Sequence, residues 1–169
     1  MVDLVVEDGS IVSGANTYAT IAEYISYAAD RGVTVTDTDT FKIQLIKAAD
    51  YIGTKETQLK GDTVEKTQPL AFPRNNITDI DGWSYNNDEI PYRVKETQMS
   101  LALDIQAGED LYNKSQSGAQ GIKREKVDGA VEVEYAISDS MRIPYSSRSN
   151  ALLASLLKFN GLGIPLAMA

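Results

Sequence analysis

Residues 121–136 read GIKREKVDGAVEVEYA. The Asp128-Gly129 pair is a strong signal for a tight turn, and on both sides of it charged residues alternate with apolar or aromatic ones. This pattern predicts a β-hairpin over 120–137. A lone hairpin leaves N–H and C=O groups unpaired along its edges, and pairing with another strand satisfies them, including the same hairpin of a second copy. The hairpin is therefore a first indication of a subunit that assembles with its neighbours.

Charge favours one register of this hairpin. A two-residue turn at Asp128-Gly129 would place Glu125 opposite Glu132, which is a destabilising like-charge pair. A bulged three-residue turn places Arg124 opposite Glu132 instead, and we favour that arrangement, although the sequence alone leaves the register open.

Helical periodicity before the hairpin predicts two helices in the first third of the chain. Thr20 and Glu23 form a capping box at the start of a helix over 21–31, and Gly32 supplies its stop. A link rich in Thr and Asp then offers N-caps for a second helix that ends near Gly53. Apolar residues at helical spacing line the second helix: Phe41, Leu45, Ala48, Ala49 and Ile52.

A third helix has a clear start. Asp88 or Glu89 can cap it, Pro91 lies in the first turn where proline is tolerated, and the pattern continues to about Ala107. Its inner face comprises Val94, Gln98, Leu101, Ala102 and Ile105.

The chain closes with a helix and an apolar tail. Ser147 or Ser149 caps the last helix, over 147–160, with a stripe of leucines facing the core. Residues 161–169 are apolar and uncharged and contain a proline. Such a tail either folds back on its own domain or docks on a partner, because in water it would expose an apolar patch. The stripe comprises Leu152, Leu153, Leu156 and Leu157.

The link between the second and third helices is unusually long. A loop of this length, 54–89, is usually functional or partly mobile in a compact domain. It contains one apolar anchor at 69–74, where two prolines exclude a regular helix and Leu70 and Phe72 can pin the loop to the core.

These elements predict a mainly α fold: a small bundle of about four helices with a projecting hairpin, a long loop and an extended C-terminal tail. We expect one domain over 1–169, because the chain is long enough for one core. Its N-terminal part is an arm or a short hairpin around the Asp8-Gly9 turn signal. The parts are 1–19, the N-terminal arm; 20–107, three helices with loop 54–89; 120–137, the hairpin; 147–160, the last helix; and 161–169, the tail.

Composition narrows the function. The chain has no Cys and no His, which excludes disulfides, thiolate nucleophiles, imidazole bases and Cys or His zinc sites. We expect no catalytic residues, no cofactor and no metal. A net charge of -8 argues against a nonspecific grip on nucleic acid, which depends on Lys and Arg. No apolar run reaches the roughly 18 residues of a membrane span, so we expect a soluble intracellular protein with no membrane partner.

The sequence supports three other functions less well. A single-stranded DNA-binding module needs a basic groove with stacking aromatics, but the basic residues here are outnumbered and scattered. Calcium binding at Asp79–Gly82 lacks the first EF-hand ligand, so an ordinary acidic turn is favoured. A hydrolase using two of the carboxylates at 79, 81, 88 and 89 lacks a pocket that would hold them at a defined separation. The aromatics of the first rival are Tyr24, Tyr27, Tyr51, Trp83, Tyr85 and Tyr92.

The chain resembles the head-to-tail adaptor proteins of tailed bacteriophages, also called head completion or connector proteins, in a branch sometimes labelled DnaT-like. The resemblance spans nearly the whole chain. Its most specific segments are QPLAFPR at 68–74, the IP helix start at 90–91 and IKREKVDGAVEVEY at 122–135. The loop 54–89 departs from the family pattern by its length.

The resemblance implies a structural virion protein. Twelve copies would form a ring that joins the capsid portal to the next tail or neck protein and lets DNA pass through its lumen without specific binding. The protein would lie at the neck of the virion, and in the host cytoplasm during assembly. We expect contacts between neighbouring copies at Lys123, Arg124, Glu125, Lys126, Glu132 and Glu134. We expect portal docking by Phe159, Leu162, Ile164, Pro165, Leu166 and Met168.

Overall fold

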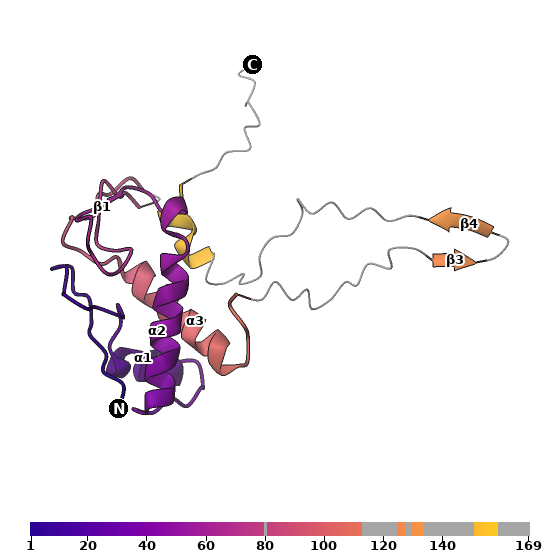
Figure 1. Cartoon of the computed structure of the whole chain (residues 1–169), viewed down its shortest axis with the longest axis horizontal. Helices are drawn as coiled ribbons and strands as arrows, with labels where there is room; N and C mark the ends of the chain where they lie inside the picture. Colours follow the sequence, from indigo (N-terminus) through magenta and orange to yellow (C-terminus); the bar gives the residue numbers. More distant parts are fainter. Residues whose placement is uncertain (80, 113–124, 128–129, 134–150, 159–169) are drawn as a thin grey trace, which may run out of the picture.

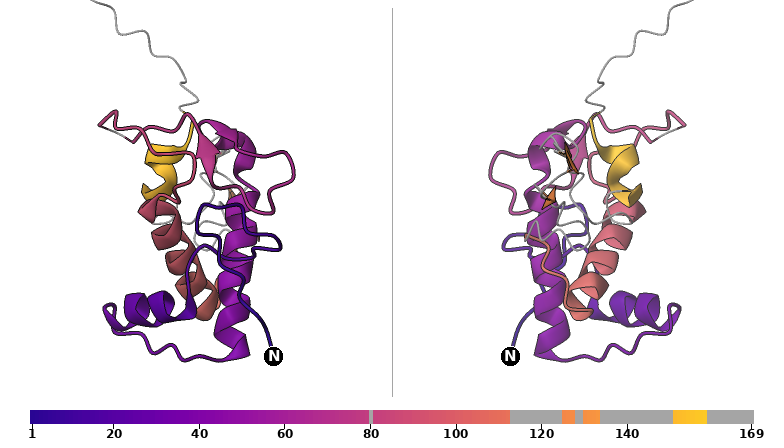
Figure 2. Two further views of the ribbon diagram at one scale, coloured as in Figure 1. Left: turned by 90° about the vertical axis from the view of Figure 1, so that its left-hand side faces the viewer. Right: turned by 90° about the vertical axis from the view of Figure 1, so that its right-hand side faces the viewer.

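Two helices that lie side by side, α2 (Asp39–Gly53) and α3 (Tyr92–Gln106), form the centre of the fold (Figure 1). The computed structural model describes residues 1–79, 81–112 and 151–158, and the backbone of 125–127 and 130–133. Figure 2 shows α1 (Ile21–Ala29) at one end of the α2–α3 pair and the helical segment that includes η3 (Ala154–Leu156) at the other. The predicted mainly α fold with a β-hairpin is confirmed, and the tail 159–169 lies outside the described residues.

α1 begins and ends at the predicted signals. The Thr20 hydroxyl oxygen accepts a hydrogen bond from the Glu23 N–H at 3.1 Å, and the Glu23 carboxylate accepts one from the Thr20 N–H at 2.6 Å. This reciprocal pair is the capping box expected from the sequence. The helix ends at Ala29, slightly before the predicted 31, and Gly32 then takes the left-handed conformation with φ of +71°.

The core lies between α2 and α3 and is closed by α1. The predicted inner face of α2 is largely buried, with Phe41 only partly so. The predicted cap of α3 is wrong: the helix begins after Pro91 with no side-chain cap, and the Glu89 carboxylate instead accepts from the Asn86 N–H at 3.3 Å. The buried side chains of the two helices are Leu45, Ala48, Ala49, Tyr51, Ile52, Val94, Thr97, Gln98, Met99, Ser100, Leu101 and Ala102.

The loop between α2 and α3 has structure of its own. It contains η1 (Glu56–Gln58) and an antiparallel pair, β1 (Asp62–Thr63) with β2 (Arg74–Asn75). Within the predicted anchor, Phe72 is buried in the core, as expected, while Leu70 is only partly buried. Leu59 and Ile77 add two buried side chains that the sequence pattern did not single out.

The N-terminal arm is not a hairpin. Val6 instead forms an isolated parallel bridge with Thr17. The reason is Glu7, whose buried carboxylate accepts hydrogen bonds at 2.9 Å from the N–H groups of Gly9, Ile11 and Val12. These bonds curl the chain around the carboxylate, so the residues flanking the Asp8-Gly9 turn cannot pair with each other.

The last helical segment ends earlier than predicted, and its predicted start at 147–150 lies outside the described residues. Residues 151–156 are helical, but Leu157 is extended and forms an antiparallel bridge with Leu59. The Lys60 N–H donates to the Leu156 carbonyl at 2.8 Å, and the Lys158 N–H donates to the Gln58 carbonyl at 2.7 Å. We call this pairing of 58–60 with 156–158 the clasp. Leu153 and Leu156 are buried in the core, as the predicted stripe requires.

The hairpin consists of β3 (Glu125–Val127) and β4 (Ala130–Val133). Val127 lies opposite Ala130, so two residues separate the paired positions and the predicted three-residue turn is wrong. Glu125 lies opposite Val133, because β4 advances three residues where β3 advances two. A bulge therefore does separate Glu125 from Glu132, as charge repulsion favours, but it lies in the strand and not in the turn.

Candidate functional site

Most of the predicted interface residues fall where the structure gives no side chains. Lys123, Arg124 and Glu134 lie outside the described residues, and Glu125, Lys126 and Glu132 belong to strands whose backbone alone is described. The predicted docking residues, from Phe159 onward, also lie outside. These interfaces remain predictions.

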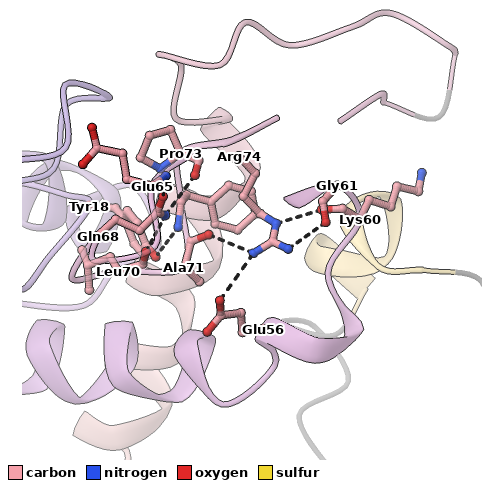
Figure 3. A network of polar contacts seen from close by, with 11 residues as sticks. Tyr18, Glu56, Lys60, Gly61, Glu65, Gln68, Leu70, Ala71, Pro73 and Arg74 are labelled. Carbon is pink, nitrogen blue, oxygen red and sulfur yellow. Dashed lines mark hydrogen bonds and ion pairs between the residues drawn. The ribbon is translucent and has the colours of Figure 1, made fainter. Parts of the chain in front are cut away.

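Arg74 is the centre of a polar network that holds the long loop (Figure 3). Its guanidinium donates to the carbonyls of Lys60 and Gly61 at 2.8 Å and of Ala71 at 3.2 Å, and lies 4.0 Å from Glu56. Burial lowers the pKa of Arg74 from its ordinary value, and the Glu56 carboxylate opposes this shift. Because three of its bonds go to loop carbonyls, this Arg serves the fold and is not offered to a ligand.

Gln68 completes the same network. Its side-chain oxygen accepts from the Glu65 N–H at 3.0 Å, and its nitrogen donates to the carbonyls of Leu70 and Pro73 at 2.8 and 3.0 Å. Together with buried Phe72, these contacts explain the QPLAFPR segment as a folding element of the loop. The segment that carries much of the resemblance is thus structural in this chain.

Gln98 is a buried polar hub that sequence reasoning placed on an apolar face without a role. Its oxygen accepts from the N–H groups of Tyr18 and Ala19 at 2.9 and 3.0 Å. Its nitrogen donates to the Thr17 hydroxyl at 2.7 Å and to the Leu45 carbonyl at 2.9 Å. Both acceptor sites of the amide oxygen and both N–H donors of the amide nitrogen are therefore used. Gln98 joins the N-terminal arm to α2 and α3 and has no hydrogen-bonding capacity left for a ligand.

Charge is distributed unevenly along the chain. Residues 1–112 contain nine Lys and Arg side chains against 19 Asp and Glu, whereas residues 113–169 contain seven against five. Several basic groups of the first part are engaged internally, including Arg74. The ion pairs include Lys42–Asp37 at 2.7 Å, Lys95–Glu23 at 3.1 Å and Arg31–Glu96 at 3.8 Å. The described core therefore presents an acidic surface in which much of the positive charge is already neutralised.

Two shallow cavities share this acidic character. One, of about 420 Å³, is lined by Asp8, Asp88 and Glu89 against a single cation, Lys95. The other, of about 290 Å³, has Asp50, Glu56 and Glu65 against Lys66. Neither composition suits a phosphate-bearing ligand, because the carboxylates would repel it. Among the described residues, no group of three or more Asp or Glu side chains is placed to hold a metal ion.

The acidic turn around Asp79 exposes an aromatic side chain. The Asp79 carboxylate accepts from the N–H groups of Asp81 and Trp83 at 2.9 and 2.8 Å, so it closes the turn in the manner of an ordinary acidic turn. Trp83 is 76% exposed, whereas Tyr24, Tyr27 and Tyr51 are buried in the core. The sequence pattern could not separate these cases, because exposure of an aromatic residue in a loop depends on the fold.

The family model described as "Putative DnaT-like ssDNA binding protein" matches residues 2–168. The chain belongs to this DnaT-like family. The predicted DnaT-like branch is thereby confirmed, while no named relative tests the adaptor assignment. The chain matches no curated protein and no solved structure. Within the described part of this DnaT-like chain, no helix has the length and apolar character needed to cross a membrane.

Proposed function

We propose that this DnaT-like chain is a noncatalytic subunit of a ring of twelve that joins a phage portal to the tail. It would lie at the neck of the virion after assembly in the host cytoplasm. The single observation that carries the proposal is the acidic helical core, with nine basic against 19 acidic side chains in residues 1–112. A channel through which DNA must pass without sticking requires such a surface, because phosphates are repelled by it.

The arrangement of the chain supports the proposal. The described core is closed by the clasp. The segments assigned to partners, 120–137 and 161–169, fall outside the sequence ranges of α1, α2, α3 and the clasp. A ring subunit needs this division, since neighbours and portal must be contacted without disturbing the fold.

Single-stranded DNA binding is the second candidate, and the description of the family favours it. Residues 1–112 are poorly suited to the task because of their charge. Residues 113–169 are the better place, with seven basic against five acidic residues and the aromatics Tyr135, Tyr145 and Phe159.

Native mass spectrometry decides between the candidates. The purified full-length chain is mixed with a portal dodecamer from the same phage, and in a parallel sample with labelled single-stranded DNA. We expect twelve copies on the portal and no DNA complex. DNA binding without portal association would reject the adaptor function and establish the nucleic-acid module.

A further inference from the structure

Residues 151–158 complete the core from one end of the molecule, opposite α1 (Figure 2). Leu153 and Leu156 of this segment are each 1% exposed, and Leu59, which bridges to Leu157, is fully buried. We call the surface around residues 58–60 that receives the segment the acceptor surface. Without the segment, apolar side chains at this surface would face water, so the acceptor surface must be filled for the core to be complete.

The contacts of this segment with the rest of the protein are few and lie in one place. Among the described residues, both backbone hydrogen bonds that join it to other elements go to the acceptor surface. The Lys60 N–H donates to the Leu156 carbonyl at 2.8 Å, and the Lys158 N–H donates to the Gln58 carbonyl at 2.7 Å. The segment can therefore leave the acceptor surface while α1, α2 and α3 keep their own hydrogen bonds.

The chain that leads to this segment is long enough to reach a second copy. Residues 113–150 connect it to Tyr112. A chain of that length spans at most about 130 Å when fully extended, whereas a body of about 110 residues has a radius of gyration of about 13 Å. The covalent connection therefore does not restrict the segment to the acceptor surface of its own chain.

The same contacts form whether the segment fills its own acceptor surface or that of a second copy, because the two copies are identical. The two arrangements differ chiefly in concentration. A tethered segment meets its own acceptor surface at an effective concentration in the millimolar range, which falls as the connection lengthens. Copies that are crowded to a similar concentration compete with this tethered contact.

We propose that residues 151–158 are an exchangeable segment, which completes the core of a second copy of this chain when copies are crowded. Each copy that accepts the segment then receives Leu153 and Leu156 from a neighbour, and the exchange links the two chains. The inference goes beyond the proposed function, since it requires neither a portal nor DNA.

Introduced thiols test the exchange in the full-length chain, which has no Cys of its own. Gln58 and Lys158 are exposed and face each other across the clasp, so thiols at these two positions are placed to form a disulfide. Gln58→Cys and Lys158→Cys are made as separate variants, mixed in equal amounts at about 1 mM and then oxidised. We expect a mixed disulfide between the two variants, with a yield that rises with protein concentration.

A mixture of Asp30→Cys with Lys158→Cys is the matched control. Asp30 is also exposed, but it follows α1 at the opposite end of the molecule. We expect at least about tenfold less mixed disulfide from this pair, counted by mass spectrometry of the linked peptides. All three variants should keep the melting temperature of the unaltered chain, because the altered side chains are exposed.

The double variant Gln58→Cys with Lys158→Cys shows where the segment lies in dilute solution. If it forms a disulfide within one chain, and the mixed single variants at about 1 mM give no more mixed disulfide than the control, the exchange is refuted. If the double variant forms no disulfide at all, the clasp itself is absent and the exchange is refuted with it. Neither result bears on portal or DNA binding, which are measured in separate samples, so the proposed function is judged independently.

Discussion

At the scale of single residues, the buried amide of Gln98 joins three parts of the core. Replacing it with Ala leaves the N–H groups of Tyr18 and Ala19 without their acceptor. It also removes the donor to the Leu45 carbonyl and to the Thr17 hydroxyl, although this hydroxyl keeps its own bond to the Ala19 carbonyl. We expect Gln98→Ala to lower the free energy of unfolding by about 3 kcal/mol or more, measured by urea denaturation. Gln44→Ala, which loses one long contact of 3.4 Å to Tyr24, is the control. Equal losses for the two variants would contradict this role.

Gly61 and Gly82 form a matched pair for a second residue-scale prediction. Both have positive φ, +67° and +86°, but a Cβ at Gly61 would lie 2.0 Å from the Asn75 carbonyl oxygen, whereas one at Gly82 meets nothing within 4 Å. Gly82→Ala should cost about 1 kcal/mol of backbone strain. Gly61→Ala must also push β1 away from β2. We expect it to lower the free energy of unfolding by at least twice as much as Gly82→Ala, measured by thermal or urea denaturation. A smaller effect at Gly61 would contradict the close approach.

At the scale of elements, the start of α1 predicts a pH dependence. Burial raises the pKa of Glu23, but hydrogen bonds from Thr20 and Lys95 outweigh burial and hold that pKa below its ordinary value of 4.5. A carboxylate whose pKa is lower in the folded than in the unfolded state stabilises the fold at pH values above the unfolded pKa. This stabilisation is lost as the pH falls through the folded pKa. Glu23→Gln should therefore be less stable than the unaltered chain near neutral pH and converge with it as the pH falls through the folded pKa of Glu23.

The difference at neutral pH should be less than about 1 kcal/mol, because the Glu23 side chain is 42% exposed and water screens the pair with Lys95. Thermal melts at low and high salt check this. If the stability difference between Glu23→Gln and the unaltered chain persisted at acid pH, or did not depend on salt, its cause would be something other than the carboxylate charge.

The clasp gives another prediction at this scale. Leu156 is 1% exposed, whereas Leu152 on the same segment is only partly buried. Leu156→Ala should lower the free energy of unfolding by about 3 kcal/mol, and Leu152→Ala by less than half as much. Similar losses in chemical denaturation would mean that the segment does not pack as described.

The elements also show what sequence could and could not predict. Periodicity located α1 and α2 to within a few residues, and the signals at Thr20, Glu23 and Gly32 set the ends of α1 because they act locally. The predicted N-cap of α2 is wrong, because Thr38 makes no side-chain cap hydrogen bond. The end of the last helix was missed, because Leu157 leaves the helical pattern to pair with Leu59, almost a hundred residues earlier. The candidate interfaces were proposed from charge and apolar patterns, whereas the exposure of Trp83 depends on packing that no local pattern encodes.

At the scale of the whole molecule, trimming the chain after Gly161 should separate folding from docking. The described core ends at 158 with the clasp, so the truncated protein should melt as the full chain does. We expect it to sediment with the portal more weakly than the full chain. Unchanged docking would remove the tail from the proposed interface.

The two ends of the insertion are held by the core, and this has a consequence for its length. Tyr112 packs edge-on against Tyr51 at 5.8 Å, and the clasp fixes the chain after its return. Both ends of the insertion are thus fixed by the described core, and for a flexible chain the entropy lost in closing a loop grows only with the logarithm of its length, by about 0.6 kcal/mol for each doubling. Residues added to or removed from 113–150 should therefore change the free energy of unfolding of the core by little, so that the length of this segment can vary between relatives while the helical body stays the same.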